Sequence, residues 1–193
     1  GTFNGHGGAV WCIDCNWDST SVLTGSADNS CRIWDLQFGK TVKEFPTKSA
    51  VRTCGFSFSG NLVAYSTDKA MGHPCELNIF DIRDDSQMKN DEPLMKLPTP
   101  RSKITSAIWG PLEDYFVTGH ENGDLILWDM RAGEMLQKSE DHTKQIQDIQ
   151  TSKDGYMLIV ASRDNTAKLF DLQTLECKKT YKADRPVNSA AIS

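Results

Sequence analysis

Pairs of an aromatic residue and an aspartate recur along this chain at nearly regular intervals. They are Trp34-Asp35, Phe80-Asp81, Trp128-Asp129 and Phe170-Asp171, separated by 46, 48 and 42 residues. A second marker, a β-branched residue that opens an apolar run, recurs at similar intervals, at Val10, Val51, Ile104, Ile146 and Val187. A period of this length is typical of small sheets repeated along a chain. We therefore expect copies of one structural unit.

The first copy, residues 5–35, shows what the unit contains. Three short runs of β-branched and aromatic residues are separated by Asp, Asn, Gly and Ser, which favour tight turns. Each copy is therefore predicted to hold three antiparallel strands, followed by an outer strand. We expect the copies at 5–35, 49–81, 102–129 and 141–171, with a further strand at 187–193.

The segment 83–100, between the second and third copies, differs from the other connections. It is polar, contains three prolines and holds one short apolar run at 94–97. We interpret the apolar run as a strand candidate and the whole segment as an enlarged outer connection, more exposed than the copies it joins. No stretch has the length and periodicity of a long amphipathic helix, so an all-β fold is expected.

Several polar residues of the first copy can satisfy one another's hydrogen bonds. A tryptophan packed in a sheet needs a partner for its indole N–H, and a buried histidine needs partners for both ring nitrogens. We predict a structural network of His6, Asp28, Trp34 and a strand hydroxyl, either Thr24 or Ser26. A catalytic acid–base pair of His6 and Asp28 is the alternative, and the repeat chemistry makes it unnecessary.

The other copies keep only parts of this network. The fourth copy retains His142 and Asp164 but has Phe170 where the first has tryptophan. The third has Asn122 at the turn and lacks the opening histidine. Only the first copy is therefore expected to form the whole network, and the others are expected to depend more on packing.

The composition narrows the class of function. The 193 residues include 26 acidic and 21 basic side chains, a net charge of −5, which argues against broad nucleic-acid binding by phosphate neutralisation. No run of about 20 apolar residues suggests a membrane span. The six cysteines lie mostly in apolar, strand-like runs, as small core residues do. A cytoplasmic protein with reduced thiols and no membrane association is expected.

We find no set of residues with the spacing of a catalytic or metal site. Cys12 and Cys15 have the C-x-x-C spacing of zinc and redox sites, but residues three apart on a strand point to opposite faces. No second cysteine pair, Gly-x-Ser-x-Gly elbow or Gly-rich phosphate loop accompanies them. The sequence therefore predicts neither catalytic activity nor a cofactor or metal.

The repeat resembles a WD repeat, the four-stranded blade of a β-propeller. Beyond this, particular phrases resemble one family, the WD-repeat i subunits of eukaryotic translation initiation factor 3. These phrases span nearly the whole chain, at 9–12 (AVWC), 22–35 (VLTGSADNSCRIWD), 49–56 (SAVRTCGF), 66–72 (STDKAMG), 102–111 (SKITSAIWGP), 164–171 (DNTAKLFD) and 185–193 (RPVNSAAIS).

The resemblance implies a seven-bladed WD40 propeller, of which residues 1–193 would form a single partial domain of about four blades. It also implies a non-catalytic scaffold that holds subunits b and g of the factor and acts indirectly on the small ribosomal subunit, without direct RNA contact. Both ends of the chain look like strands in progress, so an incomplete ring is expected. The alternative is a WD-repeat adaptor in receptor or kinase signalling. A propeller enzyme would need a polar constellation along the channel, and none is evident.

Partner-binding residues are expected where the inner strands begin, because loops and strand starts crowd together on one face of a propeller. The second position of each inner strand supplies the candidates Trp11, Arg52, Thr105, Gln147 and Asn188. Tryptophan and arginine are the most frequent binding anchors. The structural alternatives are that Trp11 packs between neighbouring copies and that Arg52 pairs with a local carboxylate.

Overall fold

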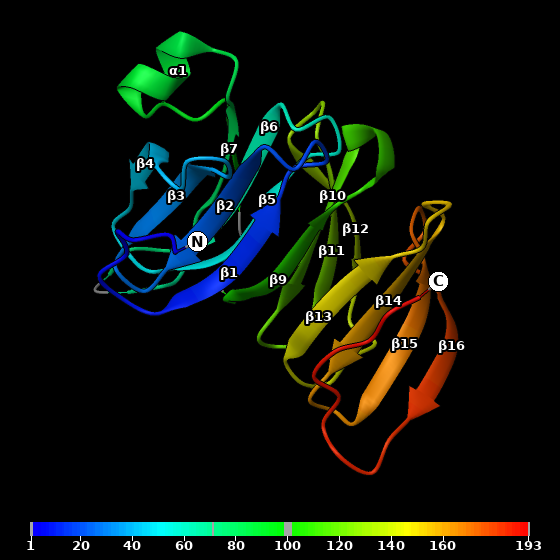
Figure 1. Ribbon diagram of the computed structural model, residues 1–193. Coiled ribbons are helices and arrows are strands. Elements are labelled where there is room, and N and C mark those ends of the chain that lie inside the picture. The colour runs from blue at the N-terminus through cyan, green and yellow to red at the C-terminus, as the bar shows by residue number, and fades with distance from the viewer. Residues whose placement is uncertain (1, 71, 99–101, 193) are drawn as a thin grey trace. The chain divides into compact units, whose positions relative to one another are not determined.

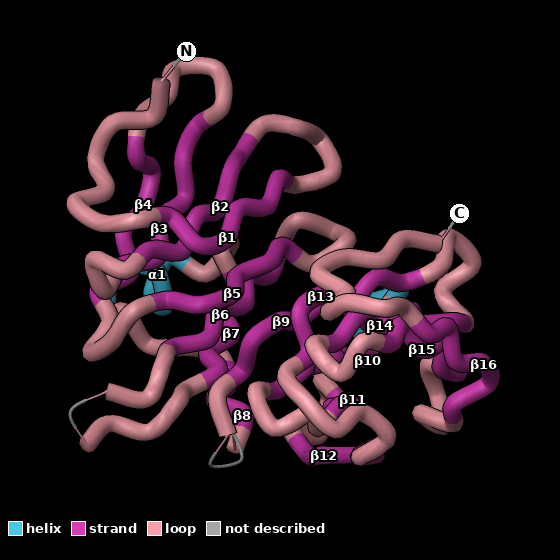
Figure 2. The backbone as a smooth tube through the Cα atoms, turned by 90° about the horizontal axis from the view of Figure 1, so that it is seen from below, coloured by secondary structure: helices cyan, strands magenta, loops and turns pink. Residues whose placement is uncertain are grey.

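The structure is a computed structural model that describes residues 2–70, 72–98 and 102–192 (Figure 1). The described residues form sixteen strands in four antiparallel sheets, each of four strands in chain order. This confirms the all-β class, and Figure 2 shows how little of the chain is helical. No helix among the described residues has the length and apolar character needed to cross a membrane.

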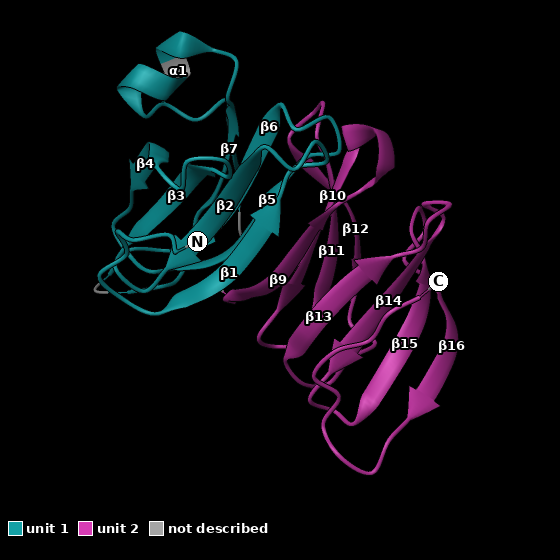
Figure 3. Cartoon of the chain, in the orientation of Figure 1, with its two compact units in different colours: residues 1–101 teal, residues 102–193 magenta. Residues whose placement is uncertain are grey.

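The chain divides into two compact units, residues 1–101 and 102–193 (Figure 3). The two sheets of unit 1 comprise β1 (Val10–Cys15), β2 (Ser21–Ser26), β3 (Ser30–Asp35) and β4 (Thr41–Pro46), then β5 (Val51–Phe56), β6 (Leu62–Thr67), β7 (Leu77–Asp81) and β8 (Met95–Leu97). The short helix α1 (Asp85–Asn90) lies in the enlarged connection before β8.

Unit 2 repeats this arrangement. Its two sheets comprise β9 (Ile104–Trp109), β10 (Tyr115–His120), β11 (Leu125–Asp129) and β12 (Glu134–Ser139), then β13 (Ile146–Thr151), β14 (Met157–Ser162), β15 (Thr166–Asp171) and β16 (Cys177–Lys182). One turn of 3₁₀ helix, Pro111–Glu113, connects β9 to β10.

The aromatic–aspartate pairs divide into a core residue and a turn residue. The four aromatic side chains, Trp34, Phe80, Trp128 and Phe170, are all buried. Each following aspartate accepts a backbone hydrogen bond from the turn after its strand, as Asp35 Oδ1 does from Phe38 N at 2.8 Å. One dipeptide thus anchors the sheet and shapes its turn, which explains why it recurs.

Within each unit the inner strand of one sheet packs closely on the next sheet. In unit 1, β5 runs beside β1 (Figures 1 and 2). A Cβ atom on Gly25 would lie 2.5 Å from Val51 Cγ1, and one on Gly119 in unit 2 would lie 2.5 Å from Ile146 Cγ2. Glycine at these two positions therefore permits a sheet separation that a larger side chain would prevent.

The C-terminal strand expected at 187–193 is not formed over residues 187–192, and residue 193 lies outside the described residues. Val187 N donates to Ser162 O at 3.1 Å, and Ser189 Oγ donates to Asp148 Oδ2 at 2.6 Å. The segment is thus held by single hydrogen bonds. A β-ladder needs a paired strand along its length, and no neighbouring strand in the described chain supplies one.

Candidate functional site

The polar residues of the first sheet form one continuous hydrogen-bond chain. Trp34 Nε1 donates to Thr24 Oγ1 at 2.7 Å, His6 Nε2 lies 2.7 Å from the same oxygen, and His6 Nδ1 lies 2.8 Å from Asp28 Oδ2. A carboxylate only accepts, so Nδ1 carries the proton and Nε2 accepts from the threonine hydroxyl. Every polar hydrogen along this route has a partner. Of the two candidate hydroxyls, Thr24 lies in the chain, whereas Ser26 Oγ accepts from Asp28 N at 3.2 Å.

Asp28 is the acceptor that closes this network. It receives hydrogen bonds from Gly7 N at 2.9 Å and from Ser30 N and Oγ at 3.0 and 2.7 Å, besides His6. Burial alone would raise the pKa of the Asp28 carboxyl, but the bonds from Ser30, His6 and Gly7 outweigh it and hold the pKa well below the usual range. The carboxylate therefore joins the chain before β1 to the β2–β3 turn.

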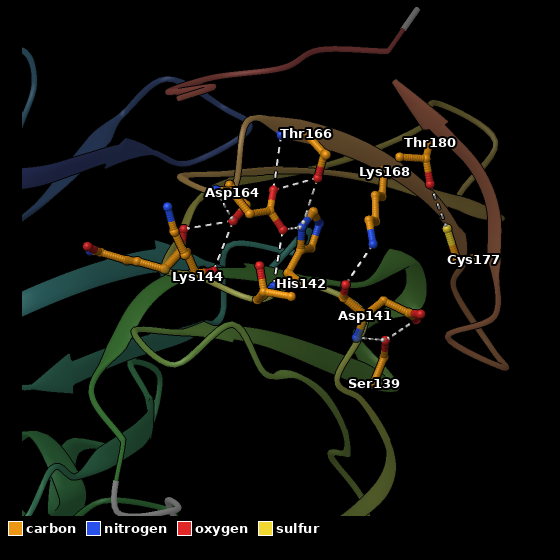
Figure 4. Close-up of polar contacts among 12 residues, drawn as sticks. Ser139, Asp141, His142, Lys144, Asp164, Thr166, Lys168, Cys177 and Thr180 are labelled. Carbon is orange, nitrogen blue, oxygen red and sulfur yellow. Dashed lines mark hydrogen bonds and ion pairs between the residues drawn. The ribbon is translucent and has the colours of Figure 1, made fainter. Parts of the chain in front are cut away.

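The fourth sheet keeps the histidine–aspartate contact of the network and lacks the tryptophan–threonine contact. His142 Nδ1 lies 2.8 Å from Asp164 Oδ2, which also accepts from Thr143 N at 3.1 Å (Figure 4). The buried His142 Nε2 has no partner among the described residues. The missing partner is explained by Val160, which occupies the register position of Thr24 and offers no hydroxyl.

The third sheet contains a hydrogen-bond chain that the repeat pattern did not reveal. Trp128 Nε1 donates to Thr118 Oγ1 at 2.9 Å, and His120 Nε2 lies 3.0 Å from the same oxygen. His120 Nδ1 lies 3.4 Å from Ser102 O. This copy is expected to depend more on packing than the first, and it nevertheless forms a hydrogen-bond chain of its own, because a histidine on β10 takes the place of the missing opening histidine. The Thr-x-His spacing within a single strand was the available sequence signal.

The second sheet has replaced the polar chain with aromatic packing. Tyr65 occupies the register position of Thr24, and its ring stacks on Phe80 with centroids 5.7 Å apart. Phe45 from β4 packs against both rings. Burial raises the pKa of Tyr65 above its usual range. Phe80 has no indole N–H to satisfy, so this sheet does not need the threonine–histidine chain.

A β-bulge occurs at the second position of every inner strand. The pairing of each inner strand skips one residue, and these residues are Trp11, Arg52, Thr105 and Gln147. They are four of the five candidate docking residues. A bulge turns a side chain out of the regular alternation of the strand and often lies beside a functional site.

In unit 1 two of these bulged residues contact each other. The Arg52 guanidinium lies 4.0 Å from the centroid of the Trp11 ring, and its Nη2 donates to Asp68 Oδ2 at 2.9 Å. Trp11 is nevertheless 41% exposed. Arg52 therefore has the local carboxylate partner considered as an alternative, and it stacks on a tryptophan that still offers a face to solvent.

The remaining three candidates lie in unit 2 and differ from one another. The Thr105 hydroxyl lies 2.6 Å from Ile146 O and 3.1 Å from Gly119 O, so it joins two neighbouring sheets. Gln147 Nε2 is buried without a partner among the described residues. Asn188 is exposed and lies outside any strand. Of the three, Asn188 offers the most accessible surface.

The six cysteines differ in their exposure to solvent. Cys15 is exposed, Cys31 and Cys75 are buried, and Cys12, Cys54 and Cys177 are intermediate. Within the described parts of the chain, no cluster of three or more His, Cys, Asp or Glu side chains is arranged to bind a metal ion.

Comparison with known proteins places the chain in a family. The model of the EIF3I family matches residues 1–193. Curated proteins named eukaryotic translation initiation factor 3 subunit I are similar over all 193 residues, with 58% identity in Taeniopygia guttata, 57% in Danio rerio and 56% in Homo sapiens. The chain spans 59% of the length of each of these relatives. It therefore belongs to the EIF3I family, that of eukaryotic translation initiation factor 3 subunit I.

Proposed function

We propose that this chain is part of a non-catalytic scaffold subunit of eukaryotic translation initiation factor 3. In this proposal its four sheets are blades of a seven-bladed WD40 propeller, and residues 1–193 form one partial domain. The scaffold holds subunits b and g and acts on the small ribosomal subunit through them, in the cytoplasm and without membrane or direct RNA contact. Family membership supports the general role in translation initiation.

The observation that carries the docking role is the bulge at the second position of each inner strand. Four bulges at equivalent positions present side chains outside the regular sheet pattern. In unit 1 they form a surface in which Trp11 lies against Arg52, which Asp68 holds in place. We call these three residues the tryptophan–arginine surface. Such a pre-ordered aromatic and guanidinium pair loses little side-chain freedom on binding.

The hydrogen-bond chain of the first sheet also supports a scaffold rather than an enzyme. If His6 were a catalytic base, Asp28 would have to orient the imidazole toward a substrate. Instead, both ring nitrogens of His6 face protein partners, Thr24 and Asp28, at 2.7 and 2.8 Å. An imidazole engaged on both sides ties the sheet together and is not positioned for proton transfer to a ligand.

The test uses the complete protein that contains this chain, mixed with purified subunits b and g. Trp11→Ala and Arg52→Ala should each weaken the binding of at least one subunit by about tenfold, as removal of a binding anchor does. Trp17→Ala is the matched control, because Trp17 is 76% exposed and lies beyond the opposite end of β1.

Equal binding by the Trp11, Arg52 and control variants, all with unchanged circular dichroism, would remove the tryptophan–arginine surface from the proposal. Purification from lysate tests the broader role. Recovery of initiation factor subunits supports the scaffold, whereas stoichiometric recovery of receptor or kinase chains without them would favour a signalling adaptor.

A further inference from the structure

Two cysteines from neighbouring sheets of unit 1 meet at their sulfur atoms. Cys12 lies on β1 and Cys54 on β5, 42 residues apart in the sequence, and the distance between their Sγ atoms is 2.9 Å. The two strands run beside each other (Figure 1). A disulfide bond requires sulfur atoms about 2.05 Å apart, so an approach of less than one ångström separates this contact from a covalent bond.

The surrounding packing directs the Cys12 sulfur toward β5. A Cβ atom on Gly25 would lie 2.5 Å from Cys12 Sγ, so only glycine leaves room for the thiol at this place. Cys54 Sγ lies 3.8 Å from Leu23 O, which holds it beside β2. Both cysteines pack against the core cluster that contains Cys31. The pair is thus placed by the approach of the two sheets and not by the C-x-x-C spacing.

We propose that Cys12 and Cys54 are a redox-active dithiol that a hydroperoxide converts into a reversible disulfide between the two sheets. One thiol loses its proton and attacks the peroxide, which forms a sulfenic acid and releases an alcohol or water. The second sulfur attacks the sulfenic sulfur, the S–O bond breaks, and water leaves. In total, two thiols and one hydroperoxide give one disulfide, one alcohol or water, and one water.

Burial slows the first step at this site, and the proximity of the two sulfur atoms speeds the second. The contact with Cys54, burial and the Asp14 carboxylate raise the pKa of the Cys12 thiol, so the first step is slower than at an exposed thiolate. The second step is intramolecular and fast, because the partner sulfur is already in contact. The sulfenic acid is therefore expected to be trapped as the disulfide before it reacts further.

The disulfide would join strands that carry the tryptophan–arginine surface. Cys12 directly follows Trp11, and Cys54 lies two residues after Arg52. Oxidation would therefore tie together the segments of β1 and β5 that present these two side chains. The dithiol chemistry itself does not depend on the proposed function, and its test needs no binding partner.

The experiment treats the complete folded protein with hydrogen peroxide, blocks the remaining thiols with N-ethylmaleimide and maps the non-reduced peptides by mass spectrometry. Cleavage with trypsin and before aspartate separates Cys12, Cys15, Cys31 and Cys54, because Asp14, Asp18 and Asp28 lie between the first three. We expect a Cys12–Cys54 peptide pair that accounts for most of the oxidised protein and disappears with dithiothreitol.

Cys12→Ser should abolish the linked peptide, whereas Cys15→Ser, the matched control on the same strand, should leave it unchanged. The disulfide should also raise the midpoint of thermal unfolding of the wild type and of Cys15→Ser, but not of Cys12→Ser. The proposal is overturned if Cys12 and Cys54 survive the peroxide as thiols and are recovered in their alkylated form, or if Cys54 links to Cys31 instead.

Discussion

Trp34 and Thr24 form the central hydrogen bond of the first sheet, with the indole nitrogen 2.7 Å from the threonine hydroxyl. Thr118 and Trp128 repeat it at 2.9 Å in the third sheet. The second and fourth sheets have phenylalanine at the tryptophan position, and there the threonine position holds tyrosine or valine. At this repeat position of the four described sheets, tryptophan thus occurs only where the neighbouring strand supplies a hydroxyl acceptor, as the cost of an unpaired buried donor requires.

Removal of the shared hydroxyl should weaken the first sheet. Thr24→Val keeps the shape of the side chain but leaves Trp34 Nε1 without an acceptor and His6 Nε2 without a donor. We expect a loss of about 1–3 kcal/mol in the free energy of unfolding, measured as a lower denaturant midpoint. Thr41→Val, at an exposed position of β4, is the control and should change little; equal effects of the two variants would contradict the prediction.

Asp28→Ala should destabilise the protein by a similar amount, about 1–3 kcal/mol. Four hydrogen bonds end on this carboxylate, and the His6 Nδ1 proton would lose its acceptor. Asn122→Ala, at the corresponding turn of the third sheet, should cost less, because Asn122 is exposed. Equilibrium unfolding of both variants is the measurement, and an equal or greater loss at Asn122 would count against this interpretation.

The fourth sheet offers a test by addition. Phe170→Trp alone introduces an indole N–H without an acceptor and should destabilise by about 1–3 kcal/mol. Val160→Thr in the same chain should restore much of that loss, because the new hydroxyl can serve both the indole and His142 Nε2. A double-mutant cycle should give a favourable coupling of about 1 kcal/mol. Additive effects of the two substitutions would show that the fourth sheet cannot form the hydrogen-bond chain that Thr24 forms in the first sheet.

Stability should fall as the pH drops below neutrality. Burial lowers the pKa values of His120 and His142 in the folded protein, whereas the unfolded chain protonates its histidines at about pH 6.5. The unfolded state therefore binds more protons below that pH, and the free energy of unfolding decreases. The lowered pKa values of Asp28 and Asp164 extend this loss below about pH 4.

Thermal unfolding between pH 7.5 and 5 measures the histidine contribution. The wild type should unfold at progressively lower temperature as the pH falls. The double variant His120→Gln with His142→Gln should show a shallower dependence, because the two buried imidazoles no longer titrate. A wild-type midpoint that is constant over this range would refute the assignment.

The sequence by itself determined the class of fold and the approximate limits of its strands. The aromatic–aspartate pairs, the β-branched strand starts and the turn residues are local signals, and each acts within a few residues of its own strand. The same signals identified His6, Asp28 and Trp34 as neighbours, because all three belong to one copy. The strand expected at the C-terminal end did not form over its described residues, since a strand also needs a partner elsewhere.

The tertiary structure decided everything that depends on register or on the approach of two sheets. Register placed Thr24 rather than Ser26 beside Trp34: both lie on the same face of β2, but Thr24 is two residues and Ser26 four residues from Val22, which pairs with Trp34. It also let His120 replace a histidine that the third copy lacks. The contacts of Arg52 with Trp11 and of Cys12 with Cys54 join residues about 40 positions apart, because each sheet must bury its apolar face against the next.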